Sequence, residues 1–213
     1  MARSSALERL PFIGPTHAPV GKLLDLLLRI AIVAMSIDAI VNANDQRFAG
    51  KALAPRDVLI SLGFAMLFPL FWRLRYRGRA WREYPWWFDC LYLSLFAFDM
   101  AGNSLGLYNT YTGTFNDITH TYGNGALMIV LAGAFGFTTL EAMGLTTILH
   151  LILQVEEYYG DVFLHTHNIV GMEGEYQQFV GGLIAVTVCG LAWYLSRDWR
   201  EKRAKRLRRP KDR

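Results

Sequence analysis

The chain has 213 residues, of which 53% are hydrophobic, 14% aromatic and only 19% charged. So few charges, combined with long continuous apolar runs, exclude an ordinary soluble domain and favour an all-α, polytopic membrane protein with a single domain. The runs lack the strict alternation of a lipid-facing barrel, and the smallest such barrels use about eight strands, so helices are predicted.

In chain order, residues 1–22 contain three prolines and lack the apolar stretch and cleavage site of a secretory signal, which predicts a short cytoplasmic arm. A bundle of about six transmembrane helices is then predicted within a membrane domain at residues 23–196. The expected helices cover residues 23–41, 58–72, 86–107, 118–137, 140–158 and 179–195. Residues 197–213 form a basic tail with ten Lys or Arg.

The basic residues are confined to a few segments, and this distribution predicts the orientation. Five arginines lie between Arg73 and Arg82. The positive-inside rule places this connection and the tail in the cytoplasm, so both termini are predicted to lie inside. All six tryptophans then fall near the cytoplasmic interface. The tail is interpreted as contacting anionic membrane lipid, rather than as a nucleic-acid-binding patch.

The middle of the chain has an unusual charge balance. Residues 83–196 contain no Lys or Arg, yet they hold ten carboxylates and four of the five histidines. An unpaired ionised carboxylate in lipid costs from about 2.5 kcal/mol upward. We therefore expect a bound metal cation, protons on the carboxyls, or a cationic ligand to balance this charge, and each alternative makes the region a functional site.

The polar residues of this stretch gather where the predicted spans reach the outer side of the membrane. Asp99 and Asn103 are four apart and share one helix face. The next two spans each carry a polar stripe at three- and four-residue spacing, and the loop that follows adds two histidines and further carboxylates. The stripes are Asp117, His120 and Asn124, then His150, Gln154 and Glu157 with Asp161; the loop holds His165, His167, Glu173 and Glu175.

This mixture of side chains predicts a divalent-metal site at the outer leaflet. Imidazole with carboxylate suits Zn, Mn or Fe, whereas carboxylate with amide oxygen suits Ca or Mg, so the identity of the metal stays open. The expected ligands are Asp117, His120, His150, Glu157, Asp161, His165, His167 and Glu173. The expected neighbours of the site are Asp99, Asn103, Asn124, Gln154, Glu156 and Glu175. His120 and His150 are the expected catalytic residues.

Some of these residues also have purely structural explanations. A histidine on a span is often only hydrogen-bonded to a neighbouring helix, and Asp117 would suit a helix cap. Asp38 is close enough to the outer end to be either solvated or a late contributor to the site. Asp89 and Glu141 are predicted to lie at the cytoplasmic ends of their spans, too far away to share it.

Two further patterns are interpreted as structural. Asp25 and Arg29 are four apart and are predicted to pair near the inner interface. Four glycines are predicted to permit close contact between helices. They are Gly133, Gly136, Gly181 and Gly182.

Three elements within residues 108–186 carry a resemblance to known proteins. The segment Asp117-Ile118-Thr119-His120 opens one span, Glu156-Glu157-Tyr158 followed by Asp161 ends the next, and an acidic, Gly-rich segment leads into Gly181-Gly182. This order resembles small bacterial membrane proteins of the VanZ-like and YjdF-like group, in which Asp-x-x-x-His or a close variant opens the span. The distant likeness of that group to phosphatidylserine base-exchange enzymes implies chemistry on lipid headgroups.

The leading hypothesis is a metal-dependent hydrolase or transferase of a lipid headgroup phosphodiester. The cation would bind the phosphate, and His120 or His150 would act as general base. The alternatives are a non-catalytic subunit that docks a protein partner through the outer loop 158–178, and a cation or proton pathway. Haem ligation is disfavoured, because His120 is near the outer end of its span and His150 is about halfway along the next.

Overall fold

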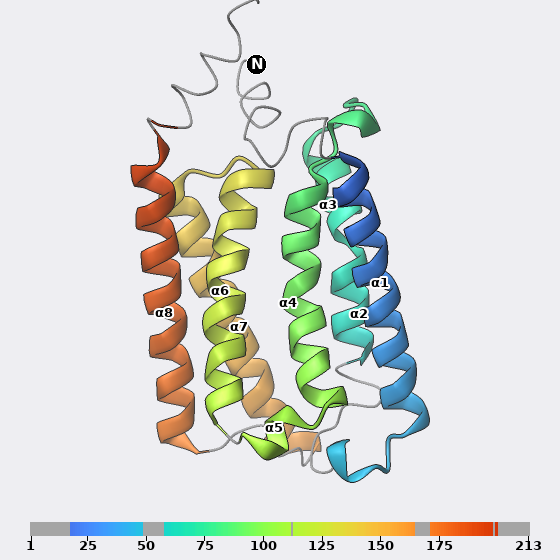
Figure 1. Cartoon of the computed structure of the whole chain (residues 1–213). Helices are drawn as coiled ribbons and strands as arrows, with labels where there is room; N and C mark the ends of the chain where they lie inside the picture. Colours follow the sequence, from blue (N-terminus) through green and yellow to red (C-terminus); the bar gives the residue numbers. More distant parts are fainter. Residues whose placement is uncertain (1–17, 49–57, 112, 165–170, 198, 200–213) are drawn as a thin grey trace, which may run out of the picture.

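The computed structural model describes residues 18–48, 58–111, 113–164, 171–197 and 199 (Figure 1). Within this part of the chain there are eight α-helices and two short 3₁₀ helices, and no β-strand, so the all-α class is confirmed. Most of the predicted cytoplasmic arm, nearly all of the basic tail, and His165 and His167 lie outside the described residues.

The long helices form six columns that run along one axis in alternating directions (Figure 1). They are α1 (Ala18–Val41), α2 (Val58–Met66) continued by α3 (Phe68–Arg75), α4 (Trp86–Ser104), α6 (Thr114–Ala134), α7 (Thr139–Leu164) and α8 (Met172–Leu195). One end of the bundle, here the α5 end, carries α5 (Leu107–Thr110) and the 3₁₀ helix η3 (Gln46–Phe48). The opposite end, here the Arg-rich end, carries residues 76–85 with the 3₁₀ helix η5 (Trp81–Glu83).

The second column is broken near its middle. Pro69 lies in the first turn of α3, where its missing N–H removes no bond from that helix but cannot continue the hydrogen-bond ladder of α2. Leu67 N donates to Phe64 O at 3.0 Å in the tighter turn that joins the two pieces. The single predicted span at 58–72 is therefore two short helices.

An aromatic core holds the Arg-rich end together. Phe68 is fully buried, and its ring lies 5.2–6.0 Å from the rings of Tyr84, Tyr92 and Phe135. Gly133 allows Phe88 to approach α6, since an added Cβ would lie 2.1 Å from Phe88 Cζ. The close contact predicted at Gly133 is therefore confirmed.

Gly136 has a different role from the one predicted. It lies beyond the end of α6 with φ of +70°, a conformation that glycine adopts without the penalty of a Cβ. It makes the turn between α6 and α7 rather than a helix contact. The wrong prediction arose because Gly136 follows Gly133 at helical spacing in the sequence.

The bundle exposes apolar side chains and buries polar ones. Ile37, Ile152 and Val188, on three different columns, are 55%, 58% and 59% exposed. The central helix α4 contacts α1, α2, α3 and α6. Polar side chains that are less than 9% exposed include Asp25, Asp89, Asn103, Asn124, His150 and Gln178.

Composition alone marks one helix in the described part of the chain, Glu173–Leu195, as long and apolar enough to cross a membrane. The other columns contain charged or polar residues or, like α2 and α3, are short. In α1 the charged residues are Lys22, Asp25, Arg29 and Asp38. The order of the helices along the chain agrees with the prediction, but the described part of the chain has eight α-helices and one candidate span, so the prediction of about six transmembrane helices is not supported.

Candidate functional site

The two histidines predicted to be catalytic meet between α6 and α7. His120 and Asn124 are four residues apart on α6 and therefore share a face. The rings of His120 and His150 have centroids 5.3 Å apart and are inclined by 31°. The predicted mismatch in their depth is wrong, because α7 continues to Leu164 and lies alongside α6 where the two rings meet.

Asn124 fixes the tautomer of His150. Its Nδ2 donates to the carbonyl oxygen of His120 at 2.8 Å and also lies 3.1 Å from His150 Nδ1. A carbonyl can only accept, so the Asn124 side chain presents its NH₂ group here, and Nδ1 of a neutral His150 must be an acceptor. The proton of His150 then sits on Nε2, which is buried and has no hydrogen-bond partner.

Glycines on α8 bring that helix close to the histidines. An added Cβ on Gly182 would lie 2.6 Å from His150 Cε1 and 2.8 Å from Asn124 Nδ2. An added Cβ on Gly181 would lie 2.7 Å from Thr121 Oγ1. The close helix contact predicted at both glycines is confirmed, and it serves the polar cluster directly.

Gln178 was missed in the sequence, and its position on α8 places it near this region. It lies four residues before Gly182, on the same face of α8, and is 1% exposed. Its Oε1 is buried without a hydrogen-bond partner. We call His120, Asn124, His150 and Gln178 the histidine cluster. The signal available in the sequence was a Gln one helical turn before a Gly-Gly pair.

A second polar group lies nearer the α5 end, between α4, α5 and α6. Tyr108 OH donates to Asp99 Oδ1 and lies 3.2 Å from Thr119 Oγ1. Burial and the neighbouring Asp99 carboxylate raise the pKa of the Tyr108 hydroxyl well above its ordinary value, so it remains a donor. Asn103 Nδ2 donates to the Asp99 backbone oxygen at 3.3 Å, which confirms the predicted shared face.

The remaining predicted residues are distributed around these two groups. Gln154 Nε2 donates to Glu157 Oε2 at 3.3 Å, and Glu175 interacts electrostatically with Asp161. Asp117 and Glu173 lie in the first turns of α6 and α8, and Glu156 is half-buried on α7. The residue at the N-cap of α6 is Gly113, so the interpretation of Asp117 as the cap is wrong.

The predicted metal ligands do not assemble as a set in the described residues. Among those residues, no three His, Cys, Asp or Glu side chains are arranged to hold a metal ion. In this tautomer His150 Nε2 carries a proton, so it presents an N–H group and not a free lone pair that could bind a metal ion. The predicted ligands His165 and His167 lie outside the described part of the chain.

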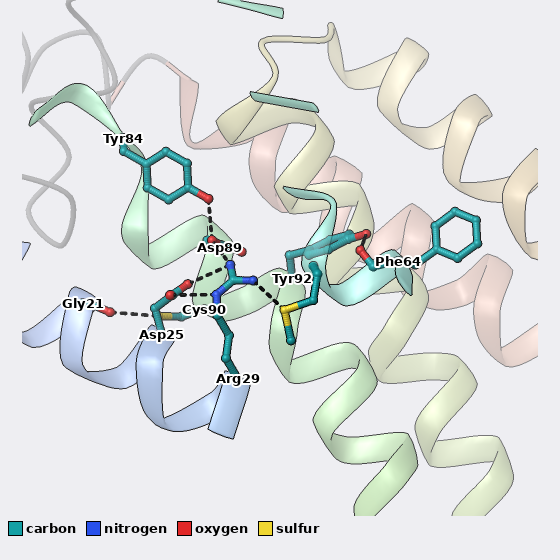
Figure 2. A network of polar contacts seen from close by, with 9 residues as sticks. Gly21, Asp25, Arg29, Phe64, Tyr84, Asp89, Cys90 and Tyr92 are labelled. Carbon is teal, nitrogen blue, oxygen red and sulfur yellow. Dashed lines mark hydrogen bonds and ion pairs between the residues drawn. The ribbon is translucent and has the colours of Figure 1, made fainter. Parts of the chain in front are cut away.

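The charge imbalance inferred from the sequence is smaller in three dimensions. Arg29 pairs with Asp25, as predicted, and also reaches Asp89, with Nη2 2.6 Å from Asp89 Oδ2 (Figure 2). Arg79 lies 3.4 Å from Glu83. Residues 83–196 contain no Lys or Arg of their own, but at least two of their ten carboxylates, Glu83 and Asp89, are paired with arginines from outside that stretch.

Two other carboxylates also have structural partners. Asp38 interacts with Arg47 at 3.2 Å and accepts a bond from Asn42 at 2.7 Å, so it does not contribute to the histidine cluster. Glu141 Oε2 accepts from Thr138 N at 2.7 Å, while Glu141 N donates to Thr138 Oγ1 at 3.3 Å. This reciprocal pair is a capping box at the start of α7.

A surface groove of about 310 Å³ lies between α4 and α6. It is lined by Ser94, Ala97, Phe98, Ala101 and Tyr122. Its two hydroxyl groups, of Ser94 and Tyr122, hydrogen-bond to each other at 2.5 Å. The wall of the groove is therefore mainly apolar. The polar side chains that could act on a substrate lie in the histidine cluster.

Comparison of the chain with protein-family models, with curated proteins and with solved structures gives no match. The resemblance to the VanZ-like and YjdF-like group therefore remains a prediction from the motifs. The function must be argued from the geometry of the histidine cluster and from the surface of the bundle.

Proposed function

We propose that this chain is an integral protein of a bacterial inner membrane, with its six helical columns crossing the bilayer. The bundle carries large apolar side chains on its outer surface and polar side chains inside, as a lipid environment favours. Arginines and buried or half-buried tryptophans gather at the Arg-rich end, which we place in the cytoplasm. The histidine cluster then lies in the outer half of the membrane or at its middle.

Cysteine labelling tests this placement. Cys90 and Cys189 are replaced by Ala, and single cysteines are introduced at the exposed positions Asn44, near the α5 end, and Arg77, at the Arg-rich end. A membrane-impermeant maleimide should label Asn44→Cys in intact spheroplasts and Arg77→Cys only after permeabilisation. The opposite pattern would contradict the orientation, and release of the protein by alkaline carbonate would contradict membrane insertion.

We propose further that the histidine cluster performs acid–base chemistry on the headgroup phosphodiester of a membrane lipid. The observation that supports this most is the buried, unpartnered Nε2–H of His150 beside the ring of His120. An N–H donor in this position suits an acceptor oxygen such as that of a phosphodiester. Imidazole can take or give a proton near neutral pH, so His120 can serve in turn as base and acid while His150 donates a hydrogen bond.

The proposed reaction is hydrolysis of the headgroup phosphodiester or exchange of its alcohol group. His120 accepts a proton from water or from an alcohol, whose oxygen forms a new bond to phosphorus. The bond from phosphorus to the departing alcohol breaks, and His120, now protonated, gives its proton to that oxygen, while His150 Nε2–H donates a hydrogen bond to a phosphoryl oxygen. Asn124 holds His150 in the tautomer that this step requires, since it occupies Nδ1. Gln178 supplies a buried acceptor that can orient a hydroxyl group.

The divalent metal predicted from the sequence is not part of this proposal. The tautomer of His150 makes its free nitrogen a donor, and the predicted carboxylate ligands do not join the histidines in the described residues. The proposal thus retains the lipid-headgroup substrate and assigns the chemistry to the two imidazoles.

Headgroup release from lipid nanodiscs tests the enzyme hypothesis. Purified protein in nanodiscs of mixed phospholipids should release or exchange a headgroup, and His120→Ala or His150→Gln should lower the rate by about 10²–10⁴-fold. Gln177→Ala, at an exposed position beside Gln178, is the matched control and should leave the rate unchanged. Inertness across a broad lipid panel would contradict the proposal. Loss of activity on adding a chelator would restore the metal to the mechanism.

A further inference from the structure

At the Arg-rich end, α1 and α4 meet through a buried cluster of acidic residues around one arginine (Figure 2). Arg29 Nε donates to Asp25 Oδ2 at 3.0 Å, and Arg29 Nη2 donates to Asp89 Oδ2 at 2.6 Å. Tyr84 OH donates to the same oxygen of Asp89 at 2.5 Å. We call Asp25, Arg29, Tyr84 and Asp89 the carboxyl cluster.

The carboxyl cluster is removed from solvent but does not balance in charge. Asp89 is 0% exposed, Asp25 is 5% exposed, and the Arg29 side chain is 20% exposed. Two ionised carboxylates against one guanidinium would leave a net charge of −1. Burying one uncompensated charge is strongly unfavourable, whereas a solvated ion pair contributes little to stability.

The surrounding elements supply no further cation in direct contact among the described side chains. On α1, Lys22 Nζ lies 5.5 Å over the Trp86 ring. On α4, Cys90 Sγ donates to Gly21 O at 3.3 Å, and Tyr92 OH donates to Phe64 O at 2.7 Å. From the second column, Met66 Sδ accepts a bond from Arg29 Nη1 at 3.2 Å.

Tyr84 supplies no positive charge to compensate the second carboxylate of the carboxyl cluster. Burial and the adjacent Asp89 carboxylate raise the pKa of its hydroxyl well above the ordinary value, so it stays a neutral donor. The second oxygen of Asp89, Oδ1, is buried and has no donor facing it. Arg29 Nη2 donates both to Asp25 Oδ1 at 3.3 Å and to Asp89 Oδ2 at 2.6 Å, so one nitrogen atom brings the two carboxyl groups together. A proton between them would satisfy that oxygen and neutralise the cluster in one step.

We propose that Asp25 and Asp89 form a proton-binding site, in which one exchangeable proton is shared between the two carboxyl groups and held by Arg29 and Tyr84. The protonated cluster is neutral and fastens α1 to α4. Loss of the proton leaves a buried negative charge at this contact and weakens the docking of α1. Arg29, the most exposed member, marks the side from which the proton is exchanged.

The number of protons bound by the folded and unfolded states determines how stability changes with pH. The folded protein binds one proton at this site at a pH at which the separated carboxylates of the unfolded chain bind none. Stability therefore falls as pH rises through the range in which the shared proton is lost. This is opposite to the behaviour of a carboxylate that is held ionised by a salt bridge, whose contribution is lost as pH falls.

Infrared spectroscopy of the full-length protein tests the proposal. At neutral pH the wild type should show a protonated-carboxyl C=O band that shifts in D₂O and disappears at higher pH. Asp89→Asn and Asp25→Asn should each remove this band. Asp38→Asn is the matched control on α1, because Asp38 interacts with Arg47 at the other end of the helix, and it should keep the band. Absence of the band from the wild type, or its persistence in both cluster variants, would overturn the proposal.

Thermal unfolding in detergent provides a second readout. The wild type should lose stability as pH rises, whereas Asp89→Asn, which mimics the protonated carboxyl, should lack this decline and keep α1 docked at high pH. If Asp89→Asn does not fold, Asp25→Asn gives the same comparison, because either amide leaves one carboxylate against one guanidinium. A parallel decline in wild type and both variants would show that the proton resides elsewhere.

Discussion

Gly182 determines how closely α8 can approach His150. The nearest atoms to an added Cβ belong to the His150 ring and the Asn124 amide, at 2.6–2.8 Å. Neither group is free to move away, because the two are hydrogen-bonded to each other at 3.1 Å. We therefore expect Gly182→Ala to lower the free energy of unfolding by about 1–3 kcal/mol, as overpacking does. Thermal unfolding in detergent measures this.

Gly144→Ala provides the comparison for that change. Gly144 is on α7, and nothing lies within 4 Å of an added Cβ there. The substitution should be neutral or stabilising by up to about 1 kcal/mol, because alanine favours a helix over glycine. Equal stability of the two variants would show that α8 is not held against the histidine cluster.

Asn124 controls which nitrogen of His150 carries the proton. Because its amide N–H points at Nδ1, the wild type should show a single Nε2–H tautomer at His150. In Asn124→Ala both tautomers should be populated, since Nδ1 loses its donor. Nitrogen-15 NMR of histidine-labelled protein distinguishes these states. A wild-type spectrum in which Nδ1 carries the proton would contradict the assignment.

For single residues, the sequence identifies candidate site residues but does not show which of them lie together in space. His120, Asn124 and His150 could be proposed because polar residues at three- and four-residue spacing share a helix face. Glu157 and Asp161 lie on the same stripe as His150, yet Glu157 accepts a bond from Gln154, and Asp161 lies near enough to the like-charged Glu175 to repel it. Helical spacing fixes the face of one helix, and it leaves open which neighbouring helix that face meets.

Among the helices, α7 begins with a capping box whose loss should be measurable. Thr138 and Glu141 each bond the backbone N–H of the other, which satisfies two amides that have no partner within the helix. Thr138→Ala should lower stability by about 0.5–2 kcal/mol, measured by thermal unfolding. Thr139→Ala, one residue further along, is the control. A Thr138→Ala variant as stable as this control would refute the role of the cap.

The helices themselves were largely predictable, and their interruptions were not. Long apolar runs without strict alternation marked the residues of all six columns as helical. The break before Pro69 was overlooked because the apolar run continues through it without any change in hydropathy. Helix α5 was missed because four residues show too little periodicity.

For the whole molecule, depth in the membrane should decide what a surface charge costs. Ile152 and Leu140 are both exposed on α7, at its middle and at its start at the Arg-rich end. Ile152→Arg should lower the yield of folded, membrane-inserted protein, since arginine at the centre of a spanning helix costs about 2.5–3.5 kcal/mol. Leu140→Arg should be tolerated. Fluorescence-detected size exclusion after membrane extraction measures both, and equal yields would contradict a bilayer around the bundle.

The partners of the buried charges could not be predicted from the sequence. A run of residues without Lys or Arg suggested that its carboxylates were uncompensated. Asp89 finds its cation 60 residues earlier in the chain, on α1. Charge counted along a segment is informative only when the neighbours in space are also neighbours in sequence, and in a helical bundle they often are not.

Under the proposed membrane placement, the contact between Arg29 and Asp89 favours one order of biogenesis. A chain made from its N-terminus delivers α1 first, with Arg29 already bonded to Asp25 one turn away on the same helix. When α4 is synthesised, the Arg29 guanidinium is already present to pair with Asp89. A permuted gene that encodes α4 before α1 would send Asp89 toward lipid with no partner, and would be expected to depend heavily on insertion factors.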